Sequence, residues 1–241
     1  PELPLNPWSP ATDRARDDDA EDLGGPRSTA QADAARSAAI GLVGGIIRRD
    51  ATGRRASTAL VFDPSGDVVA TYEKMHLPEE PGFWETSHYE AGRTPPCRID
   101  GFALPLGVQV CSDVNRPEGS HLLGAQGVDL IVCPRATERA TWPRWRTVLI
   151  ANALTSAAHV VSVNRPAAEQ GVEIGGPSFA VAPDGRVLVE TTDAVALVRL
   201  ERSVVERARG AYPGYLAIRS DVYADAWREI APRPTRGITP R

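Results

Sequence analysis

Lys74 is the only lysine in this 241-residue chain, although the chain carries 27 lysine and arginine side chains in all. Lysine bears a compact charge whose pKa shifts readily on burial, whereas arginine carries a larger planar group that stays protonated. A chain that uses arginine everywhere else keeps Lys74 either by chance on an exposed loop or for chemistry that a guanidinium group cannot perform. From composition alone these two interpretations are about equally good.

Cys111 is a second side chain that could do chemistry. It ends an apolar run that predicts a strand, and a helix is expected to begin after it, near Pro117 and Glu118. Ligands bind at strand ends in α/β folds, and a nearby helix N-terminus lowers the pKa of a thiol. This position suits a nucleophile, although a buried structural cysteine fits the same pattern. Cys133 and Cys97 are interpreted as structural.

A cysteine nucleophile needs a base, and none of the four histidines stands in a convincing arrangement with Cys111. His76, within KMHLP, is interpreted as a structural hydrogen-bonding residue. The carboxylates Glu2, Glu85 and Glu118 are better candidates, because partial burial raises the pKa of a carboxylate towards neutrality.

The cysteine count and the charge exclude several other classes of protein. Three cysteines with no CxxC pair favour reduced thiols in the cytoplasm over a disulfide framework, and their spacing with the histidines matches no metal site. We therefore expect no metal and no cofactor. A net charge of −4 and a pI near 5.7 argue against nucleic acid or an anionic membrane as the partner. No apolar run approaches the ~20 residues that a membrane-spanning helix needs.

The elements that must position these side chains follow from apolar patterns and turn residues. Residues 10–28 are polar and acidic, which predicts a surface loop. Helices are predicted at 28–40, with a serine or threonine cap at its start, and at 118–127, 141–159 and 203–212. Strands are predicted at 41–49, 56–63, 68–74, 105–111, 128–134, 160–164, twice within 175–192, and at 195–200.

This alternation of strands and helices, with hairpins between, predicts an α/β layered domain. With 42% hydrophobic residues, the chain fits one domain over residues 1–241 better than two. The Pro- and Arg-rich tail at 228–241 is expected either to be disordered or to wrap around a partner subunit.

Three blocks of the sequence resemble one known family. PEL at the start, then YEKMHLP followed by a glutamate and AG, then VCSDVNRPE, follow the order and spacing of the nitrilase, or carbon–nitrogen hydrolase, superfamily. The resemblance covers essentially the whole chain. It implies a four-layer αββα sandwich, assembly into homodimers or larger homo-oligomers, and hydrolysis of amides, N-carbamoyl amines or nitriles by a Glu–Lys–Cys triad.

By position, the resemblance implies that Glu2 is the general base, Lys74 the triad lysine and Cys111 the nucleophile. Glu85 matches a second glutamate that orders the lysine and the substrate. The backbone N–H of Ser112 would share the oxyanion with Lys74. The resemblance makes the catalytic interpretation of Lys74 the stronger one, because an arginine would be too large and would direct its charge differently.

The substrate contacts are less well defined by the sequence. Trp84, Asn115, Arg116 and Arg135 are candidates, and Arg116 stands where the family usually has an aromatic or apolar residue. Arg116 either pairs with a substrate carboxylate or forms a salt bridge with Glu118. The KMHLPEEPGFWE block resembles the carbamoylputrescine amidase and carbamoyl-amino-acid amidase branches, so the expected substrate is a small amide or N-carbamoyl amine.

Other functions stay open at this point. The same triad could hydrolyse a nitrile or transfer the acyl group to an amine, and a non-catalytic interaction protein could keep the fold. Family members also carry a strand, a helix and a strand before the PE motif, a unit of about 30 residues or more. The resemblance therefore predicts that the chain lacks this N-terminal unit, which would leave an unpaired sheet edge.

Overall fold

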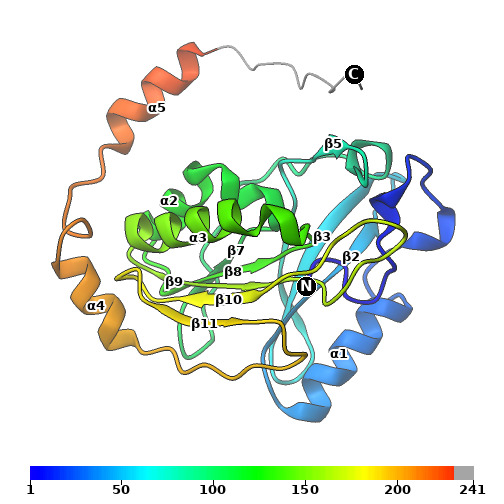
Figure 1. The fold of residues 1–241 in the computed structure, drawn as a ribbon, viewed down its shortest axis with the longest axis horizontal. Coiled ribbons are helices and arrows are strands. Elements are labelled where there is room, and N and C mark those ends of the chain that lie inside the picture. The colour runs from blue at the N-terminus through cyan, green and yellow to red at the C-terminus, as the bar shows by residue number, and fades with distance from the viewer. Residues whose placement is uncertain (231–241) are drawn as a thin grey trace.

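The computed structural model describes residues 1–230, in which two β-sheets face each other and helices cover their outer faces (Figure 1). The layers follow the order helix, sheet, sheet, helix. One apolar cluster lies between the two sheets, a second joins the first sheet to its helix, and a third joins the second sheet to its helices. This α/β architecture confirms the predicted four-layer sandwich.

The first sheet has four strands in the order β1-β2-β3-β4. Its strands are β1 (Ala20–Glu21), β2 (Leu42–Arg49), β3 (Arg55–Phe62) and β4 (Val68–Glu73). Strands β2, β3 and β4 are antiparallel neighbours, of which the β3–β4 hairpin follows from the turn between them in the sequence, and β1 lies parallel to β2. Helix α1 (Pro26–Ala38) packs on the outer face, where Ala35 contacts the apolar side chains of β2 and β3.

A glutamine joins α1 to the first sheet. The Gln31 amide donates to the carbonyl of Gly45 at 3.2 Å and accepts from the N–H of Gly45 at 2.8 Å. A Cβ on Gly44 would lie 1.8 Å from Gln31 Oε1, so the helix can approach this closely only over a glycine. The amide satisfies backbone groups of β2 that the short strand β1 does not reach.

The second sheet has five strands in the order β11-β10-β9-β8-β7. They are β7 (Leu106–Val108), β8 (Leu130–Pro134), β9 (His159–Val163), β10 (Ser178–Val181) and β11 (Val187–Thr191). Strands β7, β8 and β9 are parallel, and β10 and β11 continue the sheet antiparallel. Helices α2 (Pro117–Ala125) and α3 (Trp142–Ser156) cover its outer face through Leu123, Leu149 and Ala153.

Between the sheets lies a core to which both contribute. Ala59, Val61 and Tyr72 of the first sheet meet Leu106 and Val108 of the second. The same cluster continues beyond the end of β7 through Val110 to Cys111, and Lys74 follows directly after β4. The packing of the two sheets therefore brings the segments that carry the lysine and the cysteine together.

The C-terminal region departs from the prediction. Residues 195–200 form no strand, and Val195 and Leu197 are 79% and 93% exposed, so their apolar character alone misled the sequence interpretation. Helix α4 (Arg202–Gly210) is anchored to the body, since Arg202 and Arg209 pair with the buried carboxylate of Asp129 at 3.1 and 3.0 Å.

A further helix, α5 (Ser220–Glu229), was not predicted, and it lies away from both sheets in Figure 1. Arg228, where the predicted tail begins, is part of this helix. Residues 231–241 of that tail lie outside the described residues.

Two smaller predictions near the N-terminus were also wrong. The polar segment 10–28 is not only a surface loop: it contains strand β1, and the side chains of Asp19 and Glu21 are buried. Helix α1 is preceded by Gly25 at its N-cap, not by the predicted serine or threonine, and it begins with a proline. The short hairpin of β5 (Glu79–Glu80) and β6 (Phe83–Trp84) was not predicted.

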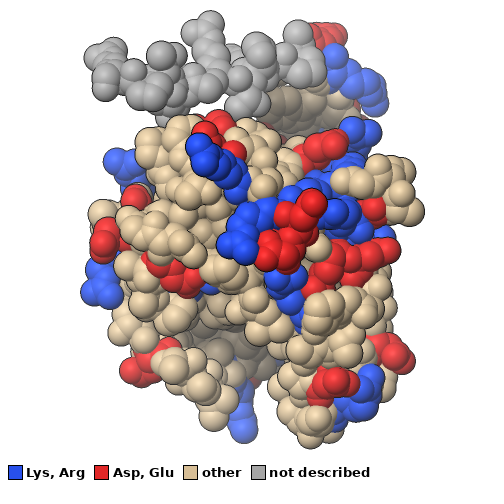
Figure 2. All heavy atoms as spheres, turned by 90° about the vertical axis from the view of Figure 1, so that its right-hand side faces the viewer, with Lys and Arg blue, Asp and Glu red and all other residues tan. Residues whose placement is uncertain are grey.

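Basic and acidic side chains lie intermixed on the face drawn in Figure 2, so that face offers no wide surface of positive charge. Within residues 1–230, no helix has the length and apolar character needed to cross a membrane.

Candidate active site

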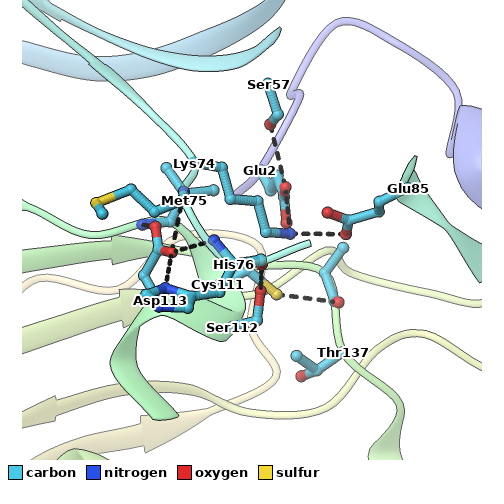
Figure 3. Close-up of polar contacts among 12 residues, drawn as sticks. Glu2, Ser57, Lys74, Met75, His76, Glu85, Cys111, Ser112, Asp113 and Thr137 are labelled. Carbon is cyan, nitrogen blue, oxygen red and sulfur yellow. Dashed lines mark hydrogen bonds and ion pairs between the residues drawn. The ribbon is translucent and has the colours of Figure 1, made fainter. Parts of the chain in front are cut away.

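Four side chains named by the sequence come from four separate segments. Glu2 lies near the chain start, Lys74 follows β4, Glu85 opens a 3₁₀ turn (Glu85–Ser87) after β6, and Cys111 opens another (Cys111–Asn115) beyond β7. All four are at most 3% exposed. Figure 3 shows the amine of Lys74 between the carboxylates of Glu2 and Glu85, with the Cys111 thiol beside it.

The Lys74 ammonium group is held by two carboxylates. Its Nζ lies 2.9 Å from Glu2 Oε1 and 2.6 Å from Glu85 Oε1, and Lys74 is 0% exposed. Burial acts to lower the pKa of Lys74, but the acidic groups that surround it, those of Cys111, Glu2 and Glu85, outweigh burial and raise that pKa well above its ordinary value. Lys74 is therefore a fixed positive charge inside the protein, which a chance surface lysine would not be.

The backbone at Cys111 is strained. Its φ is +49°, in the left-handed region that side chains other than glycine rarely adopt, and such a conformation costs on the order of 1–3 kcal/mol. The strain turns the chain sharply at the end of the strand. The thiol donates towards the carbonyl of Ala136, with 3.6 Å between Sγ and the oxygen.

The protonation state of the thiol differs from the expectation. The sequence predicted a lowered thiol pKa next to a helix N-terminus, but burial raises the pKa of Cys111 well above its usual value, and the nearby Lys74 only partly opposes this. Cys111 is therefore a neutral thiol at neutral pH, and it needs a base to take its proton as it attacks.

Glu85 carries a proton over an unusually wide pH range. Burial, with the charge of Glu2 added, raises the pKa of Glu85 from 4.5 to about 8, although Lys74 opposes the shift. Its Oε1 bonds Lys74, whereas Oε2 is buried without a hydrogen-bond partner among the described residues. When protonated, Oε2 is a hydrogen-bond donor without an acceptor among the described residues.

This shift gives a stability prediction for Glu85→Gln. Between pH 4.5 and about 8 the folded protein holds a proton on Glu85 that the unfolded chain has lost, so the free energy of unfolding falls as the pH rises, by up to about 1.4 kcal/mol per pH unit. Gln cannot ionise. The melting temperature of Glu85→Gln, relative to the unmodified protein, should therefore rise from pH 5 to pH 8. A difference that stays constant across this range would contradict the buried, protonated carboxyl.

Glu2 is positioned by residues that the sequence did not point to. Ser57 Oγ donates to Glu2 Oε1 at 3.2 Å, while Glu2 Oε2 is buried without a partner among the described residues. Arg165, just after β9, donates to the backbone carbonyls of Glu2 and Leu3, both at 2.9 Å. No sequence pattern links Arg165 to Glu2, because the two lie 163 positions apart.

The residues predicted to contact the substrate differ in how exposed they are. Trp84 is half-buried in β6 directly before Glu85, and Asn115 is exposed at the end of the turn that Cys111 opens. Arg135 is 0% exposed, and its guanidinium donates to Ser162 Oγ at 2.8 Å, to Thr137 and to the carbonyl of Pro177. With its donors used by the protein, Arg135 is better explained as a support for these loops than as a substrate contact.

Arg116 lines a cavity of about 260 Å³ together with Glu118, and the structure contains no salt bridge between these two residues. His76 and Met75, which follow Lys74 in the chain, form another part of the wall. The expected alternative of an Arg116–Glu118 pair is therefore wrong, and the Arg116 guanidinium stays available to an occupant of this cavity.

Cys133, Cys97 and His76 lie in different surroundings. Cys133 is fully buried in β8, as a structural cysteine would be, but Cys97 is exposed, which the sequence did not predict. His76 bonds Asp113, with Nδ1 2.8 Å from Oδ1, in agreement with the predicted structural role. Across residues 1–230, no three His, Cys, Asp or Glu side chains are grouped so as to hold a metal ion.

Comparison with known proteins places this geometry in context. A family model described as carbon-nitrogen hydrolase matches residues 1–209. The chloroplastic omega-amidase of Arabidopsis thaliana is 28% identical over 215 residues, which is 84% of this chain. The chain spans only 58% of the length of that relative.

Two solved structures resemble the fold. A carbon-nitrogen hydrolase from Helicobacter pylori superposes with a TM-score of 0.76 at 22% identity, over 83% of this chain and 75% of that one. A variant of an amidase from Nesterenkonia sp. AN1 superposes with a TM-score of 0.61 at 26% identity, over 70% of this chain and 63% of that one. That variant is described as carrying the acetamide moiety of fluoroacetamide, added covalently at its active-site cysteine.

Proposed function

The chain belongs to the carbon–nitrogen hydrolase family, and from this premise we propose that it hydrolyses the carbon–nitrogen bond of a small amide and releases ammonia. The observation that carries the proposal is the buried Lys74 ammonium between Glu2 and Glu85, beside the Cys111 thiol. Burying a charged group costs the fold several kcal/mol unless the group is paired, and here a lysine, two glutamates and a thiol are buried together. Such an arrangement is typical of a catalytic site.

In the first half of the proposed reaction, the Cys111 sulfur attacks the carbonyl carbon of the amide while Glu2 takes the thiol proton. Glu2 Oε1 is already bonded to Lys74 and Ser57, so the unpartnered Oε2 is the oxygen free to accept that proton. The negative oxygen of the tetrahedral intermediate binds the ammonium of Lys74 and the backbone N–H of Ser112.

Collapse of the intermediate breaks the carbon–nitrogen bond. Glu2 returns its proton to the leaving nitrogen, ammonia departs, and the acyl group stays on Cys111 as a thioester. In the second half, Glu2 takes a proton from water, the resulting oxygen nucleophile attacks the thioester, and the acid product leaves as the thiol is restored. Glu85 would hold Lys74 in place and offer the proton on Oε2 to the substrate.

The Nesterenkonia amidase supports the proposed nucleophile, because its described adduct sits on a cysteine. The plant relative, named an omega-amidase, supports the terminal amide of a small acid as substrate. Arg116, which is exposed just beyond the turn that Cys111 opens, would suit a carboxylate on such a molecule. N-carbamoyl amines remain the second substrate class to test, since the KMHLPEEPGFWE block resembles amidases of that kind.

The test is ammonia release from a panel of amides of small dicarboxylic acids, N-carbamoyl amines and nitriles, with Cys111→Ala as the control. Release from the acidic amides that vanishes in the control is the expected result. Release from the nitriles alone would overturn the amide proposal. No release, with Cys111 still alkylated by iodoacetamide, would favour acyl transfer, and an unreactive Cys111 would favour a non-catalytic protein.

A further inference from the structure

Asp113 is a buried carboxylate that the proposed reaction does not use. It is 1% exposed and lies two residues after Cys111. Its Oδ1 accepts the backbone N–H groups of Met75 and His76 at 3.2 and 2.9 Å, and the His76 ring nitrogen Nδ1 at 2.8 Å (Figure 3). Its Oδ2 accepts the Tyr72 hydroxyl at 2.9 Å and the N–H of Val110 at 3.1 Å.

These five donors belong to two segments of the chain, the one that carries Lys74 and the one that carries Cys111. Tyr72, Met75 and His76 flank Lys74 in the chain, whereas Val110 directly precedes Cys111. One carboxylate therefore joins the segment that carries the ammonium to the segment that carries the thiol. Ser112 adds a second bond between the same two segments, because its hydroxyl donates to the carbonyl of His76.

The bond to Val110 also bears on the strained residue. Cys111 keeps its positive φ only if its neighbours determine the backbone on both sides. The Asp113 carboxylate holds the N–H of Val110 on one side, and the N–H of Asp113 donates to the Val110 carbonyl at 3.1 Å. The direction of the Cys111 side chain thus depends on the same carboxylate that fixes the Lys74 segment.

We propose that Asp113 is a positioning residue, which sets the Cys111 sulfur at the correct place relative to the Lys74 ammonium group. The inference rests on the proposed function, since it concerns the placement of the nucleophile and the oxyanion charge. Misplacement of reacting groups by about 1 Å costs on the order of 10²-fold in rate. Asp113 touches no reacting atom, and its effect reaches the reaction only through the two segments it joins.

Asp113→Asn is the variant that tests this. Asn keeps the volume but replaces one acceptor oxygen with an NH₂ group, which faces N–H or O–H donors and repels them. We expect kcat to fall about 10²-fold with KM changed less than about threefold, because binding contacts are kept and alignment is lost. Unchanged kcat in a folded Asp113→Asn protein would overturn the proposal.

Asp129→Asn is the matched control. Asp129 is also a buried aspartate that accepts hydrogen bonds from charged donors, Arg202 and Arg209, but it lies directly before β8 and holds helix α4. Its replacement should lower the melting temperature and leave kcat unchanged. An equal loss of kcat in both variants would mean that general destabilisation, and not positioning, explains the effect, and would overturn the proposal.

If the Asp113→Asn protein does not fold, Tyr72→Phe tests the positioning role of Asp113 instead. It removes one donor to Oδ2 and leaves the carboxylate in place, so a three- to tenfold fall in kcat at constant KM is expected. Full kcat would contradict the proposal.

A measurement of Cys111 reactivity that needs no substrate tests the positioning role independently of the proposed function. The rate at which iodoacetamide alkylates Cys111, followed by peptide mass spectrometry against pH, should shift to higher pH in Asp113→Asn, because the Lys74 charge is no longer held beside the sulfur. If no amide is hydrolysed by the unmodified protein but this shift appears, the function is wrong and the positioning role stands. An unshifted profile in a folded variant contradicts the positioning role.

Discussion

Lys74→Arg is expected to lower kcat for amide hydrolysis by about 10³-fold or more, although the substitution keeps the positive charge. Removing one oxyanion donor from a hydrolase costs 10²–10³-fold in rate, and here the donor would also lose its partners. The ammonium fits between Glu2 and Glu85, with Nζ 2.9 and 2.6 Å from their oxygens. A guanidinium would require these carboxylates to move apart.

The same substitution has a measurable effect on stability. Lys74 is 0% exposed, so the added atoms of arginine have no space to occupy. Overpacking of this kind costs about 1–3 kcal/mol, which lowers the melting temperature without unfolding a domain of this size. The loss of activity should therefore occur in a folded protein, as circular dichroism and thermal melting would establish. Full activity in Lys74→Arg would contradict the account of the lone lysine.

Cys111→Ala is the second variant with a large expected effect. Because the thiol forms the bond to the substrate, its removal should lower kcat by about 10⁴-fold or more, as in other enzymes that lose a covalent nucleophile. Alanine at position 111 keeps the backbone strained at φ +49°, so the fold should gain little from the change. The variant should remain folded and bind substrate, which isothermal calorimetry can measure.

Cys133→Ala is the matched control for this experiment. Cys133 is equally buried, and burial raises the pKa of its thiol to about 11, but it lies in β8 within the core between that strand and the helices. The substitution removes a buried sulfur and should lower the melting temperature while kcat stays within about twofold. Loss of turnover in Cys133→Ala, with activity kept in Cys111→Ala, would mean that the wrong thiol has been assigned.

The sequence predicted those parts of the fold that local patterns encode. Strands β2, β3 and β4 follow from apolar runs separated by turn residues, and Lys74 stood out because the chain otherwise uses arginine. Cys111 stood out because a polar stretch follows it at the end of an apolar run. For the strands and for Cys111 the signal lies within about ten residues, and tertiary packing does not override it, whereas the lone lysine stands out only against the composition of the whole chain.

The parts that could not be predicted depend on contacts between distant residues. Arg165 holds the backbone of Glu2 from 163 positions away, and Asp113 bonds Met75 and His76 from nearly 40. Nothing local distinguishes either residue. The thiol pKa was predicted in the wrong direction because it depends on burial between two sheets, which the sequence of one strand does not reveal.

At residues 195–200 a local pattern predicted a strand that the structure does not contain. VALVRL has the composition of a buried strand, but no neighbouring strand pairs with it, and Leu197 is 93% exposed. A short apolar run predicts burial only where another element exists to cover it. Homo-oligomerisation and a cytoplasmic location stay predictions.

The central claim is that the acyl group passes through a thioester on Cys111. An activated ester of the preferred acid, such as its p-nitrophenyl ester, should acylate the thiol faster than water releases it, so the intermediate accumulates. Acid quenching within seconds, followed by peptide mass spectrometry, should then find the acyl group on the peptide that contains Cys111 and nowhere else, with none in Cys111→Ala. Catalytic turnover of the amide without any adduct at Cys111 would contradict the claim.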